Sequence, residues 1–117
     1  MTVDPLKRLA ETATRATPQE HAVLSDLFDQ EIARLMRARR RQLRLSRREY
    51  CERTGLNHAH LVCMEIRGAR PQIADVYASA KILKPANEDG AWRLAAELMR
   101  QAATNLLAAA QPIEQAA

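Results

Sequence analysis

The chain has 117 residues, a length that suits one domain with a single hydrophobic core. Hydrophobic residues make up 47% of the chain but aromatic residues only 3%, so alanine and leucine dominate the apolar surface, which favours an all-α protein. No apolar run approaches the roughly 18 residues that span a membrane, and the N-terminus lacks the apolar core of a signal peptide. We therefore expect a cytoplasmic protein with no membrane partner.

Positive charge is concentrated in the middle of the chain. Residues 31–84 contain 13 of the 18 lysines and arginines but only five of the 14 acids, giving a net charge of +8, whereas each flank has a net charge of −2. Such a concentration is typical of a surface that meets a polyanion, although a solvated run of charge on an exposed helix is the alternative.

The N-terminal third predicts one long helix. Residues 1–16 have no clear period and are expected to form a flexible arm or a short helix around residues 6–12. Thr17, Pro18 and Glu20 then combine a capping threonine, a first-turn proline and a glutamate three residues on, which indicates a helix start. An apolar stripe at the helical period follows: Val23, Leu24, Leu27, Phe28, Ile32, Leu35 and Met36.

The stretch from Leu45 to Gly68 predicts two short helices joined by a tight turn. Ser46 with Glu49 forms a capping box for the first helix, Gly55 provides the turn, and Asn57 caps the second helix. The two helices are expected to pack through the apolar faces that contain Leu45, Tyr50, Cys51 and Thr54 on one and Leu61, Met64 and Glu65 on the other.

A last helix is expected from Asn87 to about Ala110, ahead of Pro112. Its apolar stripe is Ala91, Leu94, Ala95, Leu98, Ala102, Leu106 and Ala109. This stripe is too long for the middle segment alone to cover, so it packs either against a second copy or back onto the chain's own core.

The residues that could act in catalysis or bind a metal do not predict an enzyme. Cys51 and Cys63 are expected to be reduced thiols, and their spacing with His58 and His60 does not match the usual paired ligands of zinc, so no metal is predicted. We find no nucleophile with its base, no glycine-rich phosphate loop and no acid pair, and hence expect no catalytic residue and no cofactor.

Residues 32–83 resemble a Cro/C1-type (XRE-like) helix-turn-helix domain. The resemblance is carried by Arg40, Leu45-Ser46, Tyr50-Cys51, Gly55-Leu56-Asn57, Leu61, Glu65 and Pro71, in register without a gap. It implies a lambda-repressor-like helix-turn-helix domain. The apolar stripes outside this segment predict additional N- and C-terminal helices: an extra N-terminal helix or an extended first helix, which gives a domain over residues 17–84, and a C-terminal dimerisation helix and tail over residues 85–117. Three departures stand out: Arg44 replaces a usual glycine, Arg47 replaces a usual glutamine, and Gly68 lies one residue late.

The resemblance also implies roles for individual residues. The base-reading positions would be Asn57, His58, Ala59, Val62 and Cys63, and the phosphate-contacting side chains Arg44, Arg47, Arg48 and His60. Arg40 would form a structural ion pair with Glu65. Because the family's DNA-binding unit usually works as a dimer, we expect the last helix, through Leu94, Leu98, Ala102 and Leu106, and the N-terminal helix to form the dimer surface.

We therefore expect a homodimeric, nucleoid-associated regulator that binds double-stranded DNA at a short palindrome and represses transcription. One alternative is an antitoxin with the same DNA-binding domain, in which a flanking segment binds a toxin. Another is a helix-turn-helix reused as a protein-interaction module that sequesters an activator, which the apolar Val62 and Cys63 would favour.

Overall fold

A computed structural model describes residues 4–116 of the chain, with side chains over residues 4–109. Within that range the chain is all-helical and contains no strand, which confirms the expected fold class. The elements in order are α1 (Pro5–Arg15), α2 (Pro18–Gln42), α3 (Arg47–Thr54), α4 (His58–Ile66), α5 (Ile73–Ala80), a 3-10 turn η1 (Lys81–Leu83) and α6 (Glu88–Ala116).

Local hydrogen bonds explain where the helices begin. Thr17 Oγ1 accepts from Glu20 N–H at 3.2 Å before α2. Asn57 Oδ1 accepts from His60 N–H at 3.1 Å before α4, and Asn87 Oδ1 accepts from Gly90 N–H at 2.8 Å before α6. Each side chain satisfies a backbone donor that the first helical turn leaves free, so the predicted starts are present.

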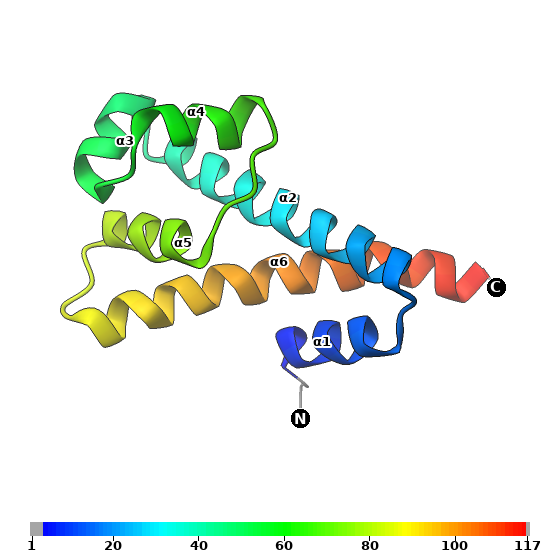
Figure 1. Ribbon diagram of the computed structural model, residues 1–117. Helices are drawn as coiled ribbons and strands as arrows, with labels where there is room; N and C mark the ends of the chain where they lie inside the picture. Colours follow the sequence, from blue (N-terminus) through cyan, green and yellow to red (C-terminus); the bar gives the residue numbers. More distant parts are fainter. Residues whose placement is uncertain (1–3, 117) are drawn as a thin grey trace.

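The helices form a layered arrangement around α6 (Figure 1). The long α6 contacts α1, α2 and α5, whereas α3 and α4 pack on each other and against α2 and α5. In the view of Figure 1, α3 and α4 lie at the top and α1 at the bottom, with α6 between them. The α3–α4 pair is therefore at the edge of the molecule, away from α1.

The core is built from large side chains on α2 to α5 and small ones on α6. Tyr50, Leu61 and Val76 are fully buried. On α6 the buried positions are mostly alanines, which allow close approach of neighbouring helices: Ala91, Ala95, Ala102 and Ala103. Burial of each large apolar side chain contributes about 1.5 to 3 kcal/mol, so this core holds α3 and α4 firmly to the rest of the chain.

The sequence left two alternatives for residues 1–16, a flexible arm or a short helix, and the described residues form the helix. Residues 5–15 are helical and pack on α6 and α2, while residues 1–3 lie outside the described range. The helix begins because Asp4 Oδ1 accepts from Leu6 N–H at 2.9 Å and Pro5 occupies the first turn. Leu6, Leu9 and Ala13 lie at helical spacing and are half-buried, which anchors the segment.

Of the four residues predicted to form a dimer surface on α6, two are covered within a single chain. Leu98 and Ala102 are buried within a single chain, with 3% and 0% of their surfaces exposed. Leu94 and Leu106 are half-buried, and Leu94 packs against the same core. The stripe is covered because α1, which the sequence did not clearly predict, adds its own apolar face to those of α2 and α5.

The end of α6 differs from the prediction as well. The helix was expected to stop near Ala110 but continues to Ala116, so that Pro112 lies inside it. Because proline has no backbone N–H, α6 has one donor fewer there.

Candidate nucleic-acid interface

The pair α3 and α4 is defined by its caps and by one glycine. Ser46 Oγ accepts from Glu49 N–H at 3.1 Å, and Glu49 Oε1 accepts from Ser46 N–H at 3.2 Å, which completes the predicted capping box. Gly55 ends α3 with φ +80°, in the left-handed region that glycine adopts without strain, and its N–H donates to Cys51 O at 2.8 Å. Only three residues therefore separate the two helices.

The inner faces of the two helices are buried as the sequence predicted. Tyr50, Cys51 and Thr54 of α3 are buried, as are Leu61 and Met64 of α4. This leaves the beginning of α4 outside: Asn57, His58 and Ala59 are exposed. Val62 and Cys63, one turn on, are half-buried, so the accessible part of the predicted base-reading set is its first three residues.

Glu65 forms the central ion pair of the site. Its Oε1 lies 2.7 Å from Arg40 Nη2, and its Oε2 accepts from Arg40 Nε at 2.9 Å, so the predicted pair of Arg40 with Glu65 is present and bidentate. The same Oε1 accepts from Arg47 Nε at 3.0 Å. Only 3% of the Glu65 side chain is exposed. This cluster links α2, α3 and α4 through one buried carboxylate.

Arg40 and Arg47 lower the pKa of the Glu65 carboxyl group even though that group is buried. Burial alone would raise the pKa of Glu65, but hydrogen bonds from Arg40 and Arg47 and their positive charges hold it below its ordinary value. Glu65 is therefore ionised at neutral pH, and the cluster stays intact. Arg40 also donates from Nη1 to Leu45 O at 2.9 Å, which fixes the loop between α2 and α3.

The predicted phosphate-contacting arginines fall into two groups. Arg44 and Arg48 are exposed, and no ion pair to either is found within the described residues. Arg47 is held by Glu65 but keeps 35% of its side chain exposed. Arg44 has φ +56°, in the left-handed region that residues other than glycine rarely adopt.

His60 does not lie free beside these arginines. Its Nε2 is 2.8 Å from Asp75 Oδ2 on α5, and that oxygen also accepts from Gln72 N–H at 2.7 Å. Its predicted role was a phosphate contact. In the structure its ring instead joins the start of α4 to the start of α5.

The exposed charge of residues 31–84 is strongly positive. Of the five acids in residues 31–84, Glu65 and Asp75 are largely buried beside basic groups, and Glu31 is paired with Arg34. Besides Arg34, the exposed arginines of this segment are Arg41, Arg44, Arg48, Arg53, Arg67 and Arg70, and they outnumber the two remaining acids. Among the described residues, Arg70 is the one of these that contacts acids, Asp26 and Asp29 of α2.

Three tertiary contacts at the site were not predicted. Arg47 with Glu65, His60 with Asp75, and Arg70 with Asp26 each join residues that are distant in the sequence. The contact of Arg47 with Glu65 could have been predicted, because Arg47 lies in the first turn of α3 and Glu65 was already predicted to face α3. The other two had no signal in the sequence pattern.

The two cysteines differ in their burial. Cys51 is buried, and burial raises the pKa of its thiol, while Cys63 is half-buried; both are free. Among the residues with described positions, no group of three or more histidine, cysteine or acidic side chains is arranged to hold a metal ion. Nor does any described helix combine the length and apolar character that crossing a membrane requires.

Comparison with family models, with curated proteins and with solved structures finds no match to this chain. Its function is therefore inferred from the residues and geometry of the site.

Proposed function

We propose that the chain is a sequence-specific transcriptional regulator that binds double-stranded DNA. In this proposal α3 and α4 act as a helix-turn-helix, and the beginning of α4 enters the major groove. The observation that carries the proposal is the exposure of Asn57, His58 and Ala59 at the start of a helix whose opposite face is fixed in the core.

The chemistry of the exposed residues suits base edges. Asparagine can pair with adenine through its amide, a histidine ring can donate to guanine, and an alanine methyl can contact the methyl group of thymine. Asn57 uses one lone pair of Oδ1 for the cap, so its Nδ2 group and the second lone pair remain for a base.

Rigidity supports the same proposal. A reading helix must be held in place to distinguish base pairs, and Glu65 anchors α4 to both α2 and α3 through Arg40 and Arg47. Arg44 and Arg48, in the loop before α3 and in its first turn, would contact phosphates on either side of the groove. Arg47 would add a third contact with the part of its guanidinium that Glu65 leaves free.

We propose that the regulator represses a promoter by binding a palindrome as a dimer. Two recognition helices must lie ~34 Å apart to read successive turns of one duplex face. Since Leu98 and Ala102 of the predicted surface on α6 are buried, the second copy would contact the exposed apolar side chains of α2, where Val23 is 57% and Leu27 is 43% exposed. Sedimentation velocity of Leu27→Glu against the native chain tests this: the variant should be monomeric at concentrations where the native chain is dimeric.

Selection of binding sites from random duplexes tests the DNA-binding proposal. We expect a short palindrome to be enriched, and affinity for it to fall with salt with a slope of about −0.9 for each phosphate neutralised. No enriched sequence, together with a salt slope near zero, would contradict it.

A second function is favoured by the apolar end of α4. Ile66 is 62% exposed, and Val62 and Cys63 are accessible in part. Such a strip could bind a protein, such as a toxin or an activator, in place of DNA. Ile66→Glu should abolish that binding and leave DNA affinity within about twofold, whereas Arg48→Gln should weaken only DNA binding.

A further inference from the structure

A pocket of about 300 Å³ opens between the end of α3 and η1. Four residues line it: Arg53 of α3, Lys81 and Ile82 of η1, and Lys84, which follows η1. In Figure 1, α3 ends at the edge of the molecule where the chain leaves α5 for η1. We call this site the cationic pocket, because three of its four lining side chains are positively charged.

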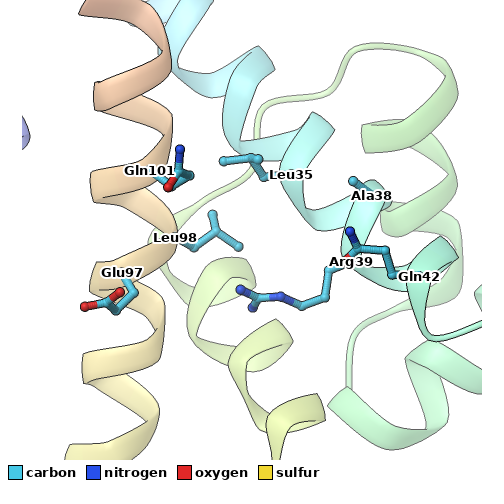
Figure 2. Close-up of a pocket in the computed structure, with 7 residues that line it drawn as sticks. All are labelled: Leu35, Ala38, Arg39, Gln42, Glu97, Leu98 and Gln101. Atoms are coloured by element: carbon cyan, nitrogen blue, oxygen red, sulfur yellow. The ribbon is translucent and has the colours of Figure 1, made fainter.

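The charge of this lining sets it apart from the groove between α2 and α6. Figure 2 shows that groove with one arginine, Arg39, and one acid, Glu97, in its lining. The lining of the cationic pocket contains no acid. Three like charges around one hollow repel one another, and an anion that enters the hollow is attracted by all three.

The three cations of the pocket are accessible from solvent. Arg53, Lys81 and Lys84 are all exposed, and no ion pair to any of them is found among the described residues. Several other arginines, by contrast, each lie against a carboxylate: Arg34, Arg40, Arg47, Arg70 and Arg100. A ligand from solvent can therefore reach the charged groups of the pocket and pair with them.

The acids of the neighbouring segments do not neutralise these cations. Glu49 lies one turn before Arg53 on α3, but its Oε1 accepts from Ser46 N–H at 3.2 Å in the cap of that helix. Hydrogen bonds from Ser46 are the main cause of the lowered pKa of Glu49, and the charge of Arg53 is a smaller one. Three further acids are exposed and form no ion pair with any described residue: Glu52, Glu88 and Asp89.

The backbone of η1 brings the two lysines to the same pocket. Lys84 N–H donates to Lys81 O at 3.0 Å, so the two residues lie one turn apart. Lys84 has φ +52°, in the left-handed region that residues other than glycine rarely adopt. This turn, packed on α3, sets where both lysines stand relative to Arg53.

The cationic pocket lies apart from the proposed DNA contacts. Arg53 is in the last turn of α3, whereas Arg47 and Arg48 are in its first turn, about 8 Å away along the helix axis. No residue of the pocket comes from α4 or from the proposed base-reading and phosphate-contacting sets. A ligand in this pocket therefore does not require that the chain bind DNA.

We propose that the cationic pocket binds the diphosphate group of a small ligand. One phosphate group carries about 1.5 to 2 negative charges at neutral pH, whereas two linked phosphate groups carry about three, which matches the three cations. The Arg53 guanidinium donates to two oxygens of one phosphate group in the bidentate geometry that it favours. The ammonium groups of Lys81 and Lys84 act as point charges on the other phosphate group.

A tryptophan next to the pocket can report its occupancy. Trp92 is the single tryptophan of the chain, and its ring centroid lies 4.4 Å from that of Tyr77. Lys81 Nζ lies 5.7 Å from the centroid of the same Tyr77 ring. A diphosphate that draws the ammonium of Lys81 into the pocket removes a cation from this aromatic pair, so the fluorescence of Trp92 should change.

Titration of the full chain with pyrophosphate tests the proposal, followed by Trp92 fluorescence and by calorimetry, at constant ionic strength and without divalent metal. Both signals should saturate with the same dissociation constant. Inorganic phosphate and sulfate should bind at least about tenfold more weakly, because each carries less charge and spans fewer of the three cations.

Substitutions locate the bound pyrophosphate. Arg53→Gln and Lys84→Gln should each weaken it about 3- to 10-fold, and the double variant more than about tenfold. Arg41→Gln and Lys7→Gln, which make the same changes at exposed side chains outside the pocket, should leave the affinity unchanged. Lys81 is kept in every variant, because its contact with Tyr77 affects the fluorescence signal itself.

Three results would overturn the proposal. Pyrophosphate that binds no more tightly than sulfate, or gives no saturable signal by either method, would mean an adventitious ion only. An equal loss of affinity in Arg41→Gln and Arg53→Gln would mean that the anion is not held in the pocket. Duplex DNA whose affinity falls as far in Arg53→Gln as in Arg48→Gln, without pyrophosphate binding, would assign the pocket to the DNA interface.

Discussion

Replacement of Glu65 by glutamine should destabilise the fold more than any other single removal of a charge. The carboxylate accepts three hydrogen bonds, two from Arg40 and one from Arg47, and is almost wholly buried. Glu65→Gln keeps the shape of the side chain but leaves two guanidinium groups without a counter-charge. Breaking a buried ion pair from one side costs about 3 to 5 kcal/mol, so we expect a loss of that size in the free energy of unfolding.

Urea unfolding followed by circular dichroism at several pH values measures this loss. The pKa of Glu65 is lowered in the folded chain, so the charge of its carboxylate stabilises the fold above the unfolded pKa, and this stabilisation disappears as the pH falls through the folded pKa. The difference between native chain and variant should therefore be full at pH 7. It should shrink as the pH drops below about 4.5, the ordinary value for glutamate.

Glu97→Gln is the matched control, because it makes the same chemical change at a side chain that is mostly exposed. It should alter the free energy of unfolding by less than about 0.5 kcal/mol at any pH. A Glu65→Gln loss below about 1 kcal/mol, or a loss that does not depend on pH, would refute the reasoning that the Glu65 cluster anchors α4.

Three further changes test other parts of the structure by the same unfolding measurement. Arg44→Gly should stabilise the chain by up to about 1 kcal/mol, because it relieves the left-handed backbone, while it weakens DNA binding; a loss of stability would contradict this. Ser46→Ala should cost about 0.5 to 2 kcal/mol through the lost cap of α3, and no change would mean that the cap is dispensable. Leu98→Ala should cost about 2 to 5 kcal/mol if α6 covers its own core, whereas Ile73→Ala on an exposed site should cost less than about 0.5 kcal/mol.

The helix starts were predictable because each depends on residues within one turn. Thr17 with Glu20 and Ser46 with Glu49 make hydrogen bonds over three positions, so their spacing in the sequence is enough. The turn at Gly55 is local in the same way. The bidentate pair of Arg40 with Glu65 spans 25 residues and was predictable only through the resemblance, which supplied the relative placement of two helices.

The partner of the α6 stripe was not predictable from the sequence. Periodicity shows that Leu98 and Ala102 must be buried, but it does not show against what. The answer depended on α1, whose short amphipathic pattern around Leu6 and Leu9 was too brief to separate from an arm. The contact of His60 with Asp75 depends on how α5 packs against α4. The local spacing of residues in the sequence therefore does not predict whether His60 contacts Asp75 or a phosphate.

The claim that α4 reads bases is tested most directly by the specificity of Asn57→Ser. Serine preserves the cap of α4, since its hydroxyl can still accept from His60 N–H, but it cannot pair bidentately with adenine. Fluorescence anisotropy at one salt concentration would compare a selected duplex with a scrambled one for the native chain, Asn57→Ser and Arg48→Gln. Asn57→Ser should reduce the ratio of the two affinities by about 5- to 100-fold, as expected for a lost base contact, whereas Arg48→Gln should weaken both duplexes equally. The account would be contradicted if the native chain bound the selected and the scrambled duplex equally and Asn57→Ser left the ratio of the two affinities unchanged.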